Sequence, residues 1–276
     1  MDRSERDRRS YRLAMEFMLN LDVPGVTESL LNTYLHPDTE AQTTNDIHQL
    51  YERLLSTAQN PNMWPIVIGK AIGGFRNFGQ VVFNFDPERT LEQYTSWEQI
   101  LDQVEEQLQP RGKIRRTSRS IWPKYCMTAL SAAEFITKFD SGQDFHEWVR
   151  VFDQDARARP ALPMLLEREI YGYGFPLACD FLKELGYHNF AKPDVHIKDI
   201  FEILTLARNR KDYEVFCAVV RIAQAVDDSP YCVDKLFWLI GSGYFYDHPE
   251  IGNNGRIGNH KAKFCDYASR KLNEAP

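Results

Sequence analysis

The chain has 276 residues, of which 43% are hydrophobic and 26% are charged. This composition excludes a disordered chain and is typical of a globular protein large enough to bury its own apolar core. The formal net charge at pH 7 is −6, so a polyanionic partner would have to bind at a local basic patch. No apolar run is long enough to span a membrane, and no apolar segment follows the charged N-terminus as it would in a secretory signal. We therefore expect a cytoplasmic protein.

None of the cysteines belongs to a C-x-x-C pair or to another compact metal-binding arrangement. Their wide spacing indicates reduced, mostly buried thiols rather than a zinc or iron–sulfur site. We therefore expect neither a bound metal nor a cofactor in the chemistry. The cysteines are Cys126, Cys179, Cys217, Cys232 and Cys265.

The first half of the chain predicts helices separated by one ambiguous segment. Amphipathic spacing predicts helices over residues 11–21 and 47–55, and residues 91–108 are predicted as one helix with an acidic face. Residues 63–86 are apolar and rich in glycine and aromatic side chains. Within them, a short strand at 81–85 and a buried helix with an irregular exit are equal alternatives.

Helix boundaries are marked more clearly in the second half. Pro163 favours a helix start, and Gly172 and Gly174 interrupt that helix. Pro176 suits the first turn of the next helix, which Gly186 ends. Other helices are predicted over residues 129–139, 145–152, 195–207 and 261–272, around the apolar positions of 216–223, and after the Ser229-Pro230 cap. The chain is thus predicted to be all-α, with two helical lobes that share a cleft.

The segment 163–186 combines two helices with a G-x-G turn. Glycines at 172 and 174 allow backbone conformations closed to other residues, so the turn can present bare N–H groups. Together with the N-terminus of the helix that holds Pro176, these groups would form an anion site suited to a phosphate. Such a contact positions a duplex without reading its sequence.

This segment and the residues that follow it resemble the helix-hairpin-helix DNA glycosylase superfamily. Ile170-Tyr171-Gly172-Tyr173-Gly174 is similar to the family's hairpin, and Pro193-Asp194-Val195-His196 to its V-D-x-H motif, 20 residues after the second glycine. Residues 231–243 are similar in character to the helix that closes the family's base pocket. The resemblance does not extend to the first 60 residues.

The resemblance implies the helix-hairpin-helix glycosylase fold. Residues 1–70 would pack with 195–276 as one lobe, and 71–194 would form the other, ending in the hairpin and the catalytic loop. It also implies a DNA-binding hairpin made by Gly172, Tyr173, Gly174 and Phe175, with double-stranded DNA as partner.

Asp194 takes the catalytic role that the resemblance implies. Cleavage of an N-glycosidic bond develops positive charge on the sugar, which a fixed carboxylate can stabilise while it orients or deprotonates a water. The nucleotide must first leave the base stack and enter a pocket. As an alternative, Asp194 only caps the helix that follows it, and the two roles can coexist.

One departure from the family concerns strand cleavage. Bifunctional members carry an amine nucleophile, a lysine, two residues after the second hairpin glycine, and this chain has Pro176 there. The departure implies a monofunctional enzyme that leaves an abasic site. A displaced nucleophile at Lys183, Lys192 or Lys198 is the alternative.

The segment 111–124 contains six basic residues and no acidic one. We expect phosphate contacts and salt-dependent binding from it, although a solvated face is an equal alternative. Trp122 and Tyr125 could stack on a base or belong to the core. The expected DNA contacts are Arg115, Arg116, Arg119 and Lys124; a second basic cluster comprises Arg208, Arg210 and Lys211.

The base pocket is expected to involve Asp180, Asp234, Trp238 and Trp64. The sequence thus predicts a monomeric, monofunctional DNA glycosylase that acts on a damaged or modified base, in repair or in defence against phage, without a membrane or an obligate protein partner. A non-catalytic DNA-binding protein that keeps the hairpin, and a glycosylase/lyase with a displaced lysine, are the alternatives.

Overall fold

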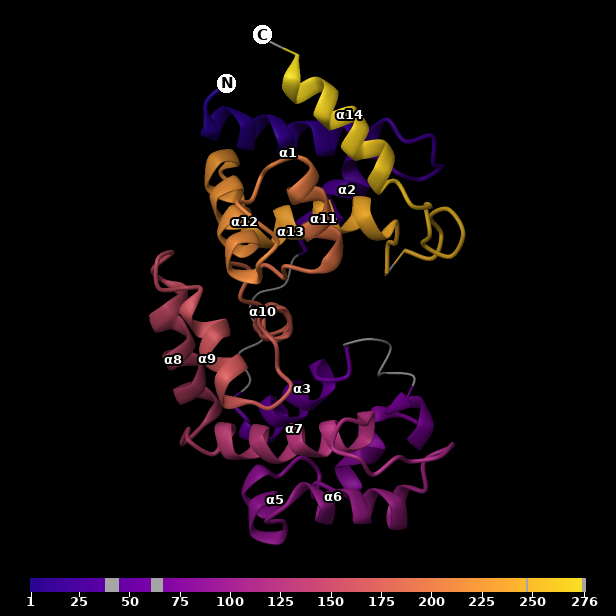
Figure 1. Cartoon of the computed structure of the whole chain (residues 1–276), viewed down its shortest axis with the longest axis vertical. Helices are drawn as coiled ribbons and strands as arrows, with labels where there is room; N and C mark the ends of the chain where they lie inside the picture. The colour runs from indigo at the N-terminus through magenta and orange to yellow at the C-terminus, as the bar shows by residue number, and fades with distance from the viewer. Residues whose placement is uncertain (38–44, 61–66, 247, 275–276) are drawn as a thin grey trace. The chain divides into compact units, whose positions relative to one another are not determined.

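The computed structural model describes residues 1–37, 45–60, 67–246 and 248–274, and within these ranges the chain is helical (Figure 1). No strand occurs in the described ranges; extended pairing is limited to isolated bridges of Arg256 with Tyr244 and with Asn253. The prediction of an all-α protein is confirmed.

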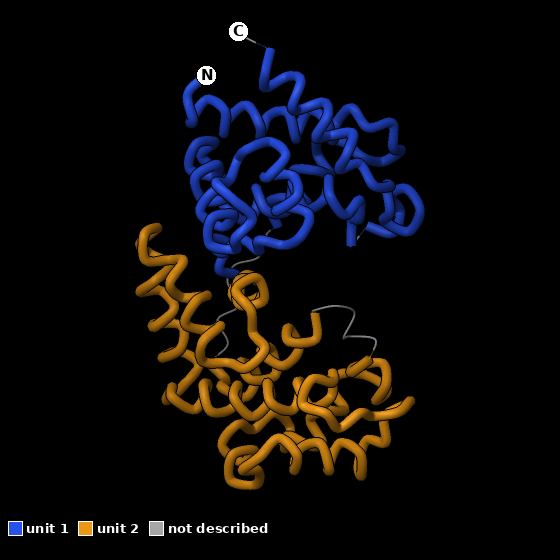
Figure 2. Tube along the Cα trace, viewed as in Figure 1, with its two compact units in different colours: residues 1–40, 186–276 blue, residues 41–185 orange. Residues whose placement is uncertain are grey.

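The chain divides into two compact units (Figure 2). Unit 1 comprises Met1–Glu40 and Gly186–Pro276, and unit 2 comprises Ala41–Leu185. The boundaries differ from the expected ones after residues 70 and 194, because the helix at 47–57 packs within unit 2: the Tyr51 hydroxyl donates to the Ala129 carbonyl at 2.9 Å. The hairpin and Asp194 therefore belong to different units.

Unit 1 is built around one central helix, α13 (Pro230–Ser242), which packs against the five others. Its boundaries follow from local sequence: the Ser229 hydroxyl accepts the Cys232 N–H, and Gly243 ends the helix at φ +64°. Edge-to-face ring contacts of Phe237 with Phe201 and Phe264 fill the core. The other helices are α1 (Arg3–Leu19), α2 (Glu28–Leu35), α11 (Val195–Ile203), α12 (Asp212–Val226) and α14 (Lys261–Asn273).

Unit 2 is organised by α7 (Ile121–Ile136), which packs against α3, α5, α6 and α9. The hydroxyl of Tyr125, in the first half of this helix, donates to the Leu55 carbonyl at 2.8 Å. The remaining elements of the unit are α3 (Ile47–Thr57), η2 (Lys70–Ile72), η3 (Phe75–Gln80), α5 (Pro87–Gln93), α6 (Trp97–Gln103), η4 (Val104–Leu108), α8 (Gly142–Asp153), α9 (Ala161–Glu169) and α10 (Phe175–Glu184).

Two predictions about unit 2 are corrected by the structure. The single helix expected over 91–108 is interrupted after Gln93, because Ser96 and Gln99 form a capping box that begins a new helix at Trp97. The strand considered at 81–85 is a turn: Phe83, Asn84 and Phe85 have φ values of 52°, 56° and 62°, which an extended strand cannot contain.

None of the described helices is both long enough and apolar enough to cross a bilayer. The five cysteines are free thiols; four are buried and Cys217 is half-buried.

Candidate active site

Asp194 stands at the N-terminus of α11 in unit 1. Its Oδ1 accepts the backbone N–H groups of His196 and Ile197 at 2.9 and 3.1 Å, which fixes the carboxylate as the helix cap. Among the described residues, no group donates a hydrogen bond to its second oxygen, Oδ2. The capping role considered from the sequence is thus present, and it leaves one carboxylate oxygen available for chemistry.

The pKa of Asp194 is raised above that of an ordinary carboxyl group. Burial is the main cause, the N–H of Ile197 opposes it, and the negative charge of Asp234 adds to it. A raised pKa makes a carboxylate a better proton acceptor, as a general base requires.

Asp234 supports the loop that carries Asp194. It lies on α13, is only 2% exposed, and accepts the backbone N–H of Lys192 at 2.8 Å. The carbonyl of Lys192 in turn accepts the N–H of Asp194 at 2.8 Å. The Asp234 carboxylate on α13 therefore fixes the backbone that leads to Asp194 at the start of α11.

His196 is a residue of this site that sequence reasoning left without a role. Its ring packs against Gly241 of α13, where an added Cβ would lie 2.5 Å from the His196 Cβ. The ring nitrogen Nδ1 is buried and has no hydrogen-bond partner in the described structure. The histidine of the Pro193–His196 motif was the available signal, but the contact with Gly241 joins residues 45 positions apart.

The arrangement can stabilise developing positive charge. One oxygen of Asp194 is held by two N–H groups, and no described residue donates to the other. The carboxylate could therefore stabilise a cationic sugar or accept a proton from water without giving up these two bonds. The buried Asp234 holds the loop before Asp194 in place through its hydrogen bond with the Lys192 N–H.

The hairpin in unit 2 is held by its backbone to α7. The Tyr171 N–H donates to the Ser131 hydroxyl at 2.9 Å, and the Thr128 hydroxyl donates to the Tyr171 carbonyl at 2.8 Å. Gly172 has φ +74° and is exposed, and Gly174 caps α10. The turn therefore presents backbone at the surface of its unit.

The Tyr173 and Phe175 side chains, expected to contact DNA, are core residues. They are 1% and 3% exposed, and the Tyr173 hydroxyl donates to the Leu54 carbonyl. Contacts with DNA at these two positions would have to use the backbone.

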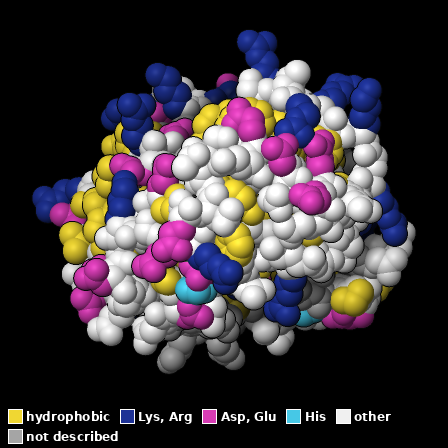
Figure 3. Space-filling model, turned by 90° about the horizontal axis from the view of Figure 1, so that it is seen from below, with side chains coloured by type: hydrophobic (Ala, Val, Ile, Leu, Met, Phe, Trp, Pro, Cys, Tyr) yellow, Lys and Arg dark blue, Asp and Glu magenta, His cyan; other side chains and the backbone are white. Residues whose placement is uncertain are grey.

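The basic segment separates into paired and unpaired cations. Arg116 forms ion pairs with Asp102 and Glu105, whereas no hydrogen bond or ion pair among the described residues holds the side chains of Arg115, Arg119 or Lys124. Figure 3 shows basic and acidic side chains interspersed on one face of the molecule, so on that face any attraction for phosphate has to be local.

A pocket of about 470 Å³ lies at the start of this segment. Its basic lining comes from Arg111, Lys113 and Lys70, with Trp122 beside them. Lys70 is distant in sequence and sequence reasoning missed it; the Arg111 N–H donates to the Ala71 carbonyl at 2.9 Å, which brings the two parts together. Trp122 is 5% exposed and Tyr125 is fully buried, so both are core residues rather than stacking platforms.

The described residues expected around the base are divided between the two units. Asp180 belongs to unit 2, where it accepts the Asn60 amide at 3.0 Å. Asp234 and Trp238 belong to unit 1, and the Trp238 ring stacks on Tyr246 at 4.9 Å between ring centroids. Trp64 lies outside the described residues.

One group of side chains in unit 1 could hold a metal ion. The ligand atoms of His36, Asp228 and Cys232 lie within 4.8 Å of one another. Burial raises the pKa of the Cys232 thiol to about 12, and the thiol donates to the Leu35 carbonyl at 3.0 Å. A metal would have to displace this proton.

Comparisons of the chain with models of protein families, with curated proteins and with solved structures found no match.

Proposed function

We propose that the protein is a DNA glycosylase that hydrolyses the N-glycosidic bond of a flipped-out, damaged or modified base, with Asp194 as the catalytic carboxylate. The observation that carries this proposal is the environment of the Asp194 carboxyl group. One of its oxygens is fixed by two N–H groups, the other accepts no hydrogen bond from the residues that the structure describes, and burial raises the pKa of the group. The duplex contacts of this proposal come from the hairpin backbone with Gly172 at φ +74° and from Arg115, Arg119 and Lys124, whose side chains have no hydrogen bond or ion pair among the described residues.

The direct test is mass spectrometry of free bases released from genomic DNA and from phage DNAs with modified cytosines. We expect release by the wild-type and a loss of at least about 100-fold in Asp194→Asn, because the amide still accepts the N–H groups but carries no charge. Asp86→Asn is the matched control, since Asp86 caps α5 in the same manner through the Arg89 N–H at 2.9 Å. Base release by Asp194→Asn at the wild-type rate would refute the assignment. Release from genomic DNA would indicate a role in repair, and release only from the modified phage DNAs would indicate a role in defence.

A non-catalytic DNA-binding protein is the second candidate, because capping alone accounts for the two hydrogen bonds at Asp194. It predicts duplex binding without release of any base.

Ion pairs hold the ammonium groups of Lys198 and Lys183, which the lyase alternative considers as nucleophiles. Lys198 is bound to Asp212, and Lys183 lies 3.6 Å from Asp180. Borohydride trapping of a covalent DNA adduct would identify a reactive lysine.

A further inference from the structure

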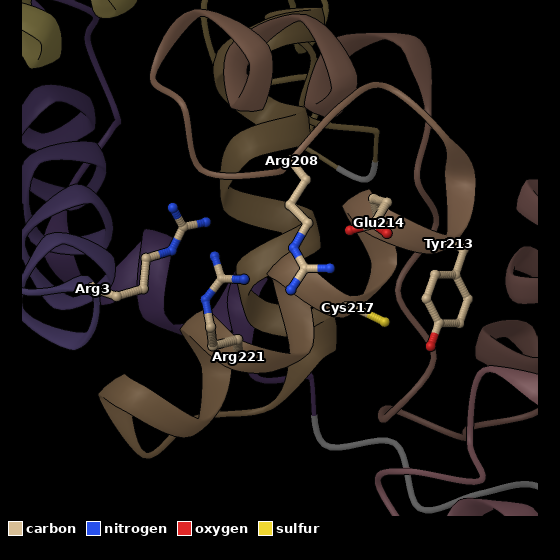
Figure 4. A pocket seen from close by; sticks show the side chains of 6 residues that line it. All are labelled: Arg3, Arg208, Tyr213, Glu214, Cys217 and Arg221. Carbon is tan, nitrogen blue, oxygen red and sulfur yellow. The ribbon is translucent and has the colours of Figure 1, made fainter.

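A second charged site lies in unit 1 around the loop that joins α11 to α12. It is a cavity of about 430 Å³ whose lining includes three arginines from three elements: Arg3 of α1, Arg208 of the loop and Arg221 of α12. Figure 4 shows the three guanidinium groups pointing toward one another into the same space. Tyr213, Glu214 and Cys217 complete the lining.

Two of these arginines are fixed in place by the protein. Arg221 holds the fully buried Asp7 through Nε at 2.6 Å and donates through Nη2 to the Leu206 carbonyl at 2.6 Å. Arg3 donates to the carbonyls of Thr205 and Leu206. Hydrogen bonds from these arginines therefore hold the backbone of the loop just before Arg208.

Arg208 itself has no hydrogen bond or ion pair among the described residues, and its side chain is exposed. Arg210, two positions further on, is held by both Asp199 and Glu202 at 2.6 Å. The two exposed arginines thus differ: Arg210 is bound to two carboxylates, whereas Arg208 lines the cavity.

The charge at the cavity is incompletely neutralised. The pKa of the Arg3 guanidinium is lowered by burial and by the positive charges of Arg221, Arg6 and Arg208, while Asp7 opposes the shift. Glu214 is the one acidic side chain in the lining. An anion in the cavity would be attracted by three guanidinium groups and repelled by the half-buried Glu214 carboxylate and by the buried Asp7, which pairs with Arg221 and Arg3.

We propose that this cavity binds a phosphate group, with Arg208 and the Nη1 group of Arg221 as its donors. Nη1 of Arg221 has no partner in the described structure, and planar guanidinium groups donate in pairs to phosphate oxygens. The phosphate could belong to a DNA strand or to a free phosphate monoester, because both present the same oxygens. The site goes beyond the proposed function, since base excision by Asp194 does not require it.

The first experiment measures the affinity of inorganic phosphate by calorimetry at constant ionic strength, with chloride as the reference anion. We expect Arg208→Gln to weaken binding about tenfold or more, because it removes a charge-assisted donor. Arg210→Gln is the matched control and should bind as the wild-type does. Glu214→Gln should bind more tightly, because it removes a repelling carboxylate from the lining. Equal affinity of the Arg208→Gln and Arg210→Gln variants, or no binding by the wild-type, would overturn the proposal.

A second experiment distinguishes the two sources of phosphate, using a 20-base-pair duplex and a deoxynucleoside 5′-monophosphate. If DNA is the occupant, Arg208→Gln lowers the slope of log affinity against log salt for the duplex by about one. If a monoester is the occupant, that slope is unchanged and the monophosphate loses affinity in Arg208→Gln only. Independence of both ligands from Arg208 would refute the site. Neither measurement uses base release, so a protein without glycosylase activity that still binds phosphate through Arg208 would refute only the proposed function.

Discussion

The carboxylate of Asp234 accepts the backbone N–H of Lys192 at 2.8 Å, although the two residues are 42 positions apart. This bond places a buried charge on α13 directly beneath the loop that ends in Asp194. It gives Asp234 two separable effects on Asp194: a geometric one through the loop, and an electrostatic one through its charge.

The two effects of Asp234 can be separated by substitution. Asp234→Asn keeps an acceptor for the Lys192 N–H but removes the charge that raises the pKa of Asp194. Because the reaction needs Asp194 ionised, we expect the acidic limb of the pH–rate profile for base release to move to lower pH in Asp234→Asn. Asp234→Ala should also lose about 1–3 kcal/mol in the free energy of unfolding, since a buried N–H loses its acceptor. An unshifted acidic limb in Asp234→Asn would contradict the electrostatic coupling.

Asp194 should cost stability at neutral pH. Burial raises its pKa in the folded protein, so the folded state binds this proton more tightly than the unfolded chain does. The stability of the wild-type therefore falls as pH rises through the folded pKa, whereas Asp194→Asn has no proton to lose. In urea denaturation, we expect the free energy of unfolding of Asp194→Asn to increase relative to that of the wild-type as pH rises from about 4 to about 8. A stability difference that does not change with pH would show that the carboxyl is not penalised by burial.

The contact of His196 with Gly241 predicts a steric coupling between α11 and α13. Gly241→Ala would place a Cβ 2.5 Å from the His196 Cβ, which forces the first turn of α11 to move. We expect a loss of about 1–3 kcal/mol in the free energy of unfolding and a slower release of base, because Asp194 caps that turn. The double variant His196→Ala/Gly241→Ala should recover much of the stability, and simple additivity of the two changes would contradict direct contact.

The two hairpin glycines should differ in their tolerance of alanine. Gly172 has φ +74°, and an added Cβ would lie 3.2 Å from the Thr128 hydroxyl. Gly174 has φ −71°, and the nearest atom to an added Cβ is 3.8 Å away. Gly172→Ala should therefore destabilise the protein by about 1 kcal/mol or more and weaken duplex binding, while Gly174→Ala should be nearly neutral in stability. Thermal unfolding and duplex titration measure the two effects, and equal losses in both variants would be evidence against a strained turn.

In the basic segment 111–124, we expect Arg115 to contact DNA and the ion-paired Arg116 not to do so. Arg115→Gln is expected to weaken duplex binding and to lower the salt slope by about one. Arg116→Gln should leave the slope unchanged, because Asp102 and Glu105 already neutralise this residue. Duplex affinity measured over a series of salt concentrations tests both. If Arg116→Gln weakened duplex binding more than Arg115→Gln did, the segment 111–124 would be excluded as the duplex contact.

Local sequence determined most of the helical framework. Ser229 with Pro230, Pro176 and Gly186 were identified as helix boundaries from the sequence because capping and turn geometry depend on residues within one turn of each other. The break before Trp97 is also local, but its signal, Ser96 with Gln99, was obscured by the continuous apolar spacing of 91–108. The all-α class and the role of Asp194 as a helix cap were therefore accessible from the sequence.

Tertiary structure alone decided which side chains meet. Arg115 and Arg116 are equivalent in sequence, and only the approach of α6 and η4 neutralises one of them. In the same way, Asp180 accepts the amide of Asn60, a residue 120 positions away, within unit 2. The support of the Asp194 loop by Asp234 and the convergence of Arg3, Arg208 and Arg221 join segments separated by tens to hundreds of residues. The physical reason is that hydrophobic burial fixes how helices pack but is non-directional, so the partner of each polar side chain is set only once the packed helices have brought distant residues together.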